Sequence, residues 1–144
     1  MVRTVRVLIV DDHALFAEAL MLTLGIDPRI EVVAHASNGP EAITLARTLR
    51  PDVVLMDLHM PGMDGIQTTK ALLGALPSAR VVMVTASAAP QCMQWAREAG
   101  AVRYITKETA ACNLIDTVIE VGATPSQPLL VPKLSEPATL GRTA

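Results

Sequence analysis

The chain has 144 residues, 51% of them hydrophobic, with a formal net charge of −2, which allows one domain with a buried core and a short extra segment. It lacks both a run of about 18 apolar residues, as needed to span a membrane, and a block of Lys and Arg residues, as needed to bind nucleic acid. Cys92 and Cys112 do not have the spacing of a metal site, so we expect free thiols in a cytoplasmic protein. Membrane insertion and DNA binding by this segment alone are not expected.

The apolar pattern predicts five strands, each followed by a helix. Strand-like apolar runs lie at residues 5–10, 30–35, 52–57, 80–85 and 101–105. Segments with helical periodicity follow them, at residues 14–26, 39–49, 64–75, 88–99 and 109–121. Strands and helices that alternate in this way form a parallel sheet covered on both faces, so we predict a doubly wound α/β domain.

Helix ends and helix faces can be predicted from single residues. Gly100 and Gly122 follow helical segments and are expected to be C-terminal caps. In the helix predicted at 88–99, Met93 is expected to lie on the core-facing stripe, which leaves Trp95 toward the side or the outside.

The regular pattern ends near Gly122. Residues 123–144 contain four prolines among Ser, Thr and Ala, so we expect a linker or tail after a domain that comprises residues 1–122.

Three aspartates follow two of the predicted strands. Asp11 and Asp12 end the first apolar run, and Asp57 ends the third. Ligands of open α/β sheets bind at the carboxyl ends of the strands, where we expect these carboxylates to converge. At about 4 Å and an effective dielectric of about 20, each pair of like charges costs about 4 kcal/mol, so the cluster needs a cation or a proton. An all-oxygen site of this kind suits Mg2+.

Two more polar residues end later strands of the predicted sheet. Thr85 closes the fourth apolar run, and Lys107 follows the fifth. Together with the aspartates they supply metal ligands, a nucleophile, a hydroxyl donor and a cation at one edge of a sheet. Such a set is typical of phosphoryl transfer, in which positioning and charge neutralisation provide most of the catalysis.

These motifs, in this order and spacing, resemble the receiver domain of two-component response regulators. The matching segments are residues 7–13, 56–65, 84–86 and 104–107, and the resemblance covers residues 5–122. It implies a flavodoxin-like fold with the strand order 2-1-3-4-5 and five helices.

The resemblance also implies a phosphoacceptor and its metal ligands. Asp57 would accept the phosphoryl group. Asp12 and Asp57 would bind Mg2+ directly, Asp11 through water, and the backbone carbonyl of His59 would complete the protein ligands. The His59 side chain would tune the phosphoryl lifetime at the pocket mouth, or it is simply a solvated loop histidine.

Contacts to the phosphoryl group and a switch are implied in the same way. Lys107 would pair with the phosphoryl group, while Thr85 and the backbone N–H of Ala86 would donate hydrogen bonds to it. Thr85 and Tyr104 would form the switch, although a tyrosine in a strand also serves in packing. Ser87, two residues after Thr85, either tunes the phosphoryl lifetime or is a solvated loop residue.

A narrower resemblance concerns the type of regulator. The sequence Asp11-Asp12-His13 with Phe16, and Glu108 after Lys107, resembles the NarL/LuxR type of transcriptional regulator. We assign no role to His13 from the sequence. The resemblance implies phosphorylation by a histidine kinase, possible homodimer formation, and DNA binding only through a helix-turn-helix domain that these residues do not contain. We favour a receiver cut from a longer regulator over a natural single-domain receiver.

Two other classes of protein share features with this sequence. A phosphatase of the haloacid-dehalogenase type also uses an aspartyl nucleophile, but it has a second aspartate two residues later, where this chain has His59. A pseudo-receiver that acts only as an interaction module is the other alternative, and the complete set of polar residues at the strand ends argues against it. We therefore expect a switch that turns over no external metabolite.

Overall fold

The computed structural model describes residues 3–123, in which five strands alternate with five helices. The strands are β1 (Val5–Val10), β2 (Ile30–Ala36), β3 (Val53–Met56), β4 (Arg80–Thr85) and β5 (Arg103–Thr106). The helices are α1 (Ala14–Gly25), α2 (Gly39–Leu49), α3 (Gly65–Ala75), α4 (Pro90–Ala99) and α5 (Lys107–Ala123). The strands are parallel, in the order β2-β1-β3-β4-β5, which confirms the predicted flavodoxin-like fold.

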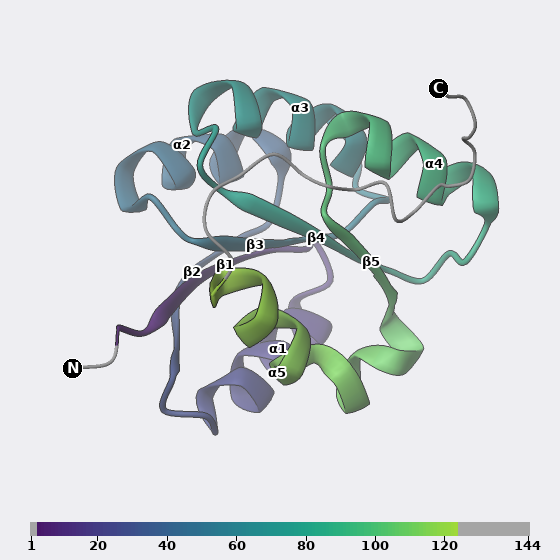
Figure 1. The fold of residues 1–144 in the computed structure, drawn as a ribbon. Helices are drawn as coiled ribbons and strands as arrows, with labels where there is room; N and C mark the ends of the chain where they lie inside the picture. Colours follow the sequence, from purple (N-terminus) through teal and green to yellow (C-terminus); the bar gives the residue numbers. More distant parts are fainter. Residues whose placement is uncertain (1–2, 124–144) are drawn as a thin grey trace, which may run out of the picture.

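The sheet separates two hydrophobic cores. Helices α2, α3 and α4 cover one face, and α1 and α5 cover the other (Figure 1). Successive residues of one strand serve the two cores in turn: Leu8 of β1 packs with the first group of helices, and Ile9 packs with the second. Because both faces are buried, the central strands are mostly apolar and β3 is apolar at every position, which is why the sequence shows continuous apolar runs.

The register of β1 and β3 positions the acidic residues. Val10 pairs with Met56 across these neighbouring strands, and the backbone N–H of Asp57 donates to the carbonyl of Val10 at 2.9 Å. The residues that follow the two strands therefore emerge side by side at the carboxyl edge of the sheet.

The two glycines predicted as helix caps differ in role. Gly100 is a left-handed cap with φ of 113°, as predicted. Gly122 is not a cap, because α5 continues through it to Ala123. A Cβ at Gly122 would lie 2.6 Å from a side-chain carbon of Val5, so this glycine allows the helix to approach β1 closely.

The prediction for the faces of α4 was half right. Trp95 is 48% exposed, as expected, but Met93 is also exposed, at 42%. The buried residues of α4 are Cys92, Ala96 and Ala99. The stripe thus begins one residue earlier than predicted, because the small Cys92 side chain takes the place in the core that was assigned to the larger methionine.

Three further expectations concern the linker, membrane-crossing helices and the cysteines. The expected linker lies outside the described residues, apart from Ala123, which belongs to α5. Between residues 3 and 123, none of the helices has the length and apolar character that crossing a membrane requires. Both cysteines are free thiols.

The cap at Gly100 provides a test of the fold. We expect Gly100→Ala to lower the free energy of unfolding by about 1–2 kcal/mol, because a left-handed backbone disfavours a side chain, and the new Cβ would lie 2.5 Å from Leu73 Cδ1. The matched control is Gly74→Ala in α3, where an added Cβ has no neighbour within 4 Å in the described part of the chain. It should stabilise by about 0.5–1 kcal/mol. Urea denaturation measures both, and a Gly100→Ala variant as stable as the wild type would contradict the cap.

Candidate functional site: an acidic pocket at the strand ends

Asp57 lies directly after β3 and is 3% exposed. The N-terminus of α3 packs against its backbone: Gly65 donates its N–H to the carbonyl of Leu58 at 2.9 Å. A Cβ at Gly65 would lie 2.2 Å from the backbone oxygen of Asp57, so only glycine fits this place. The importance of Gly65 could not be found from the sequence alone, since it depends on the return of α3 to the end of β3.

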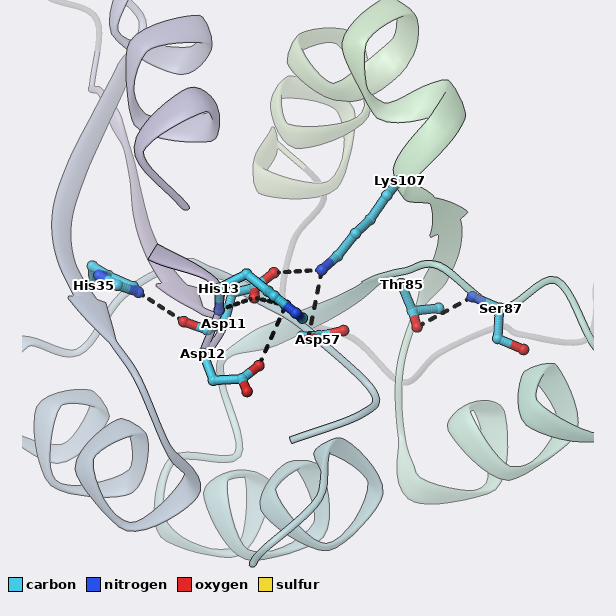
Figure 2. Close-up of polar contacts among 8 residues, drawn as sticks. All are labelled: Asp11, Asp12, His13, His35, Asp57, Thr85, Ser87 and Lys107. Carbon is cyan, nitrogen blue, oxygen red and sulfur yellow. Dashed lines mark hydrogen bonds and ion pairs between the residues drawn. The ribbon is translucent and has the colours of Figure 1, made fainter. Parts of the chain in front are cut away.

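Asp11 and Asp12 directly follow β1. Hydrogen bonds to neighbouring residues fix the conformation of the chain at this point. Oδ1 of Asp11 accepts the backbone N–H of His13 at 2.8 Å. Nε2 of His35, from the end of β2, lies 2.8 Å from the backbone carbonyl of Asp11 and donates to it (Figure 2). His35 is a second residue that the sequence did not reveal, because its contact crosses from one strand to the next.

Lys107 reaches the acidic residues from the start of α5. Its Nζ lies 3.0 Å from Oδ2 of Asp11 and 3.7 Å from Oδ2 of Asp57 (Figure 2). The same ammonium lies 4.5 Å from the centre of the Phe16 ring, a cation–π contact that guides the side chain toward the pocket. Four of the residues predicted for the site, Asp11, Asp12, Asp57 and Lys107, are therefore brought together.

The electrostatics of the cluster oppose full ionisation of Asp57. Burial and the neighbouring carboxylate of Asp11 raise the pKa of Asp57 to about 6, against the favourable contribution of Lys107. Asp12 raises this pKa further, and the backbone N–H of His59 lowers it. Burial and repulsion thus raise the pKa of Asp57 by more than the single ammonium group of Lys107 lowers it.

The same cluster has the properties of a cation site. Oδ1 of Asp12 and Oδ2 of Asp57 are buried and have no hydrogen-bond partner among the described residues. Ligating atoms of Asp11, Asp12, His13 and Asp57 lie within 4.8 Å of one another. Three carboxylates and one ammonium leave an excess of negative charge that one divalent cation would balance. Mg2+, which prefers oxygen ligands, fits this donor set.

Thr85 belongs to a second group of contacts next to the acidic cluster. Its buried hydroxyl accepts the backbone N–H of Ser87 over a long 3.5 Å (Figure 2). The hydroxyl of Tyr104 donates to the backbone carbonyl of Ser87 at 2.6 Å. Burial raises the pKa of Tyr104, so the phenol keeps its proton and remains a donor at neutral pH. Thr85 and Tyr104 are therefore linked through Ser87.

The remaining predicted residues lie on exposed loops. The His59 side chain and Ala86 are both exposed. Metal binding by the His59 carbonyl and phosphoryl binding by the Ala86 N–H stay predictions.

The raised pKa of Asp57 predicts how stability depends on pH. Since this pKa is about 6 in the folded state, against an ordinary value of 3.8, the contribution of Asp57 to stability is greatest below pH 4 and is lost as the pH rises through 6. In metal-free buffer at pH 8 we expect Asp57→Asn to stabilise the protein by up to about 3 kcal/mol, with a gain that shrinks toward pH 4. Urea denaturation at several pH values measures this gain. Glu98→Gln, which removes an exposed charge on α4, is the control and should show no such trend.

Comparison with known proteins agrees with the fold and identifies a family. The sequence matches the response regulator receiver domain family over residues 7–119. It is 39% identical over 114 residues to the transcriptional regulatory protein LiaR of Bacillus subtilis, which covers 79% of this chain and 54% of LiaR. It is 38% identical over 115 residues to the response regulator protein VraR of Staphylococcus aureus, which covers 80% of this chain and 55% of VraR.

A similar solved structure is the signal receiver domain of the response regulator NarL from Mycobacterium tuberculosis. Its TM-score is 0.79 at 32% sequence identity, and the match covers 83% of this chain and 97% of that one. The chain spans about half the length of LiaR and VraR. With its fold and its motif set, this chain belongs to the response regulator receiver domain family.

Proposed function

We propose that this domain is a phosphorylation-controlled switch in which Asp57 accepts a phosphoryl group from a histidine kinase. The observation that carries the proposal is the buried Asp57 carboxylate, with one oxygen that has no hydrogen-bond partner in residues 3–123, beside Asp12 and Lys107. Receiver domains bind Mg2+ in an acidic pocket, and Asp11, Asp12 and Asp57 would hold it here, with the His59 carbonyl as a further ligand.

In the proposed reaction, an oxygen of the Asp57 carboxylate forms a bond to phosphorus. The bond from phosphorus to the histidine nitrogen of the kinase breaks, and the electron pair stays on that nitrogen, which takes up a proton. Bound Mg2+ would neutralise the negative charge of the pocket and of the phosphoryl oxygens. Lys107, 3.7 Å from Asp57, lies within reach of the phosphoryl group that Asp57 would carry.

The conformational response would pass through Thr85, the Ala86 N–H and Tyr104. Moving a two-state equilibrium from 1:99 to 99:1 takes about 5.5 kcal/mol, whereas one hydrogen bond to a charged group contributes about 1.5–3 kcal/mol. Thr85 alone is insufficient. If its hydroxyl turns toward the phosphoryl group, it releases the N–H of Ser87, whose carbonyl is bound to Tyr104. Ser87 would thus connect the two switch residues, and with the His59 side chain it would influence the phosphoryl lifetime.

The proposed output is control of transcription. Response regulators generally transmit signals rather than act as enzymes, and LiaR is a transcriptional regulatory protein. In the proposal, the domain acts in the cytoplasm, turns over no external metabolite, and changes its contacts with an effector domain or with a second copy of itself. DNA would be bound by a separate helix-turn-helix domain, since this chain has a net charge of −2.

Phosphoryl uptake tests the assignment of Asp57. We expect the protein to take up one phosphoryl group from acetyl phosphate in the presence of Mg2+ and almost none after chelation, because the acidic cluster repels an incoming anion. Intact-mass spectrometry measures the uptake. Asp57→Asn should abolish it. Asp64→Asn is the matched control, because asparagine can keep the hydrogen bond to Gln67 N–H at the start of α3. Uptake by Asp57→Asn at the wild-type level would reject the assignment.

The role of Thr85 is tested separately. We expect Thr85→Ala to bind the phosphoryl mimic beryllofluoride but to lose most of the change in NMR chemical shifts around Tyr104. Thr85→Ser keeps the hydroxyl and should retain the response. A full wild-type response in Thr85→Ala would contradict this coupling scheme.

A further inference from the structure

His13 lies beside the acidic pocket without a role in the proposed reaction. Its Nδ1 lies 3.3 Å from Oδ1 of Asp11 and 3.5 Å from Oδ1 of Asp12. Figure 2 shows its side chain next to the carboxylates of Asp11 and Asp12. The side chain is 66% exposed, so an ion that arrives from solvent can reach it.

Local structure directs the imidazole toward the acids. His13 is the residue before α1, with extended backbone angles, and within the described residues its side chain makes no capping hydrogen bond to that helix. Its backbone N–H is held instead by Oδ1 of Asp11 at 2.8 Å. The ring is therefore held next to the carboxylates and does not cap the helix.

We propose that the pocket is a mixed oxygen and nitrogen site, in which Nδ1 of His13 joins the carboxylates as a ligand for divalent transition-metal ions such as Zn2+. The inference rests on the cation pocket of the proposed function. Besides the cluster itself, it is supported by the buried oxygens of Asp12 and Asp57 that have no hydrogen-bond partner among residues 3–123.

The chemistry of the donors favours this class of ion. Imidazole nitrogen is a good ligand for zinc, copper and nickel, whereas Mg2+ prefers oxygen ligands and keeps much of its water. Ligands about 2.0–2.1 Å from a tetrahedral zinc ion lie about 3.3–3.4 Å apart, whereas neighbouring ligands of octahedral Mg2+ lie about 2.9 Å apart. The 3.3 Å hydrogen bond from Nδ1 to Asp11 and the 3.5 Å separation from Asp12 are of this order, so an ion that replaces the hydrogen bond needs only small movements of these side chains to contact them.

The other two histidines of the chain differ from His13 in this respect. Nε2 of His35 donates to a backbone carbonyl, that of Asp11, whereas Nδ1 of His13 forms its hydrogen bond with a carboxylate oxygen of the pocket. His59 is exposed on the loop after Asp57 and is absent from the group of residues with clustered ligand atoms. Because His35 supports Asp11 and the His59 carbonyl is a proposed ligand, the control is Glu98→Gln, at an exposed position of α4.

The test compares metal affinities of the full 144-residue chain by isothermal titration calorimetry, with Zn2+ and Mg2+ titrated separately. We expect His13→Ala to weaken Zn2+ binding by about tenfold to a hundredfold and to change Mg2+ binding by less than about twofold. Glu98→Gln should alter neither affinity. Asp12→Asn should weaken both. Circular dichroism verifies that each variant is folded.

Side-chain 15N NMR supplies a direct readout of the ligand. Zn2+ should shift the Nδ1 resonance of His13, and Mg2+ should not. The inference is overturned if this resonance is unchanged by Zn2+, if His13→Ala leaves Zn2+ affinity intact or weakens the binding of both ions equally, or if Glu98→Gln costs as much Zn2+ affinity as His13→Ala. Retained Zn2+ affinity in Asp12→Asn would place the ion elsewhere and also overturn it. Loss of Mg2+ binding or of phosphoryl uptake by the wild type would instead count against the proposed function.

Discussion

Repulsion among three carboxylates at one edge of the sheet is the constraint on which the site depends. The register of β1 against β3 places Asp11 and Asp57 next to each other, and burial prevents water from screening their charges. One ammonium group, from Lys107, offsets only part of this repulsion, as the raised pKa of Asp57 indicates. The negative charge of the pocket thus favours binding of a cation, and binding of a phosphoryl group together with that cation.

The surroundings hold the repelling groups in place with contacts that carry no net charge. Gly65 lets the start of α3 lie against the backbone of Asp57, and His35 holds the carbonyl of Asp11 from the neighbouring strand. The Phe16 ring supports the ammonium of Lys107. The surrounding contacts therefore hold the acidic side chains in place, so the pocket does not need a bound cation in order to form.

The α/β class of the fold and the acidic residues at the strand ends were predictable from local sequence, whereas the strand order was implied by the resemblance to receiver domains. Continuous apolar runs indicate strands buried on two faces, and a polar residue directly after such a run must lie at the edge of the sheet. What could not be predicted depends on contacts between distant segments. Gly122 looked like a helix cap because its close approach to Val5 is not visible in the sequence. The contacts of His35 and Gly65 were missed for the same reason. The stripe of α4 was misplaced because Cys92 and Met93 are both apolar, and only packing decides between them.

Lys107 is both a member of the acidic pocket and the first residue of α5, and this has a mechanical consequence. Helix α5 has 17 residues, so it is about 25 Å long. Strand β5 ends at Thr106 and α5 begins at Lys107 with no linker between them, so the start of the helix is the end that the sheet holds. If α5 tilts as a rigid rod about that start by about 5°, its last turn moves through about 2 Å. A small change of direction at the pocket therefore becomes a larger displacement at the far end of α5, and a contact made there acts back on Lys107.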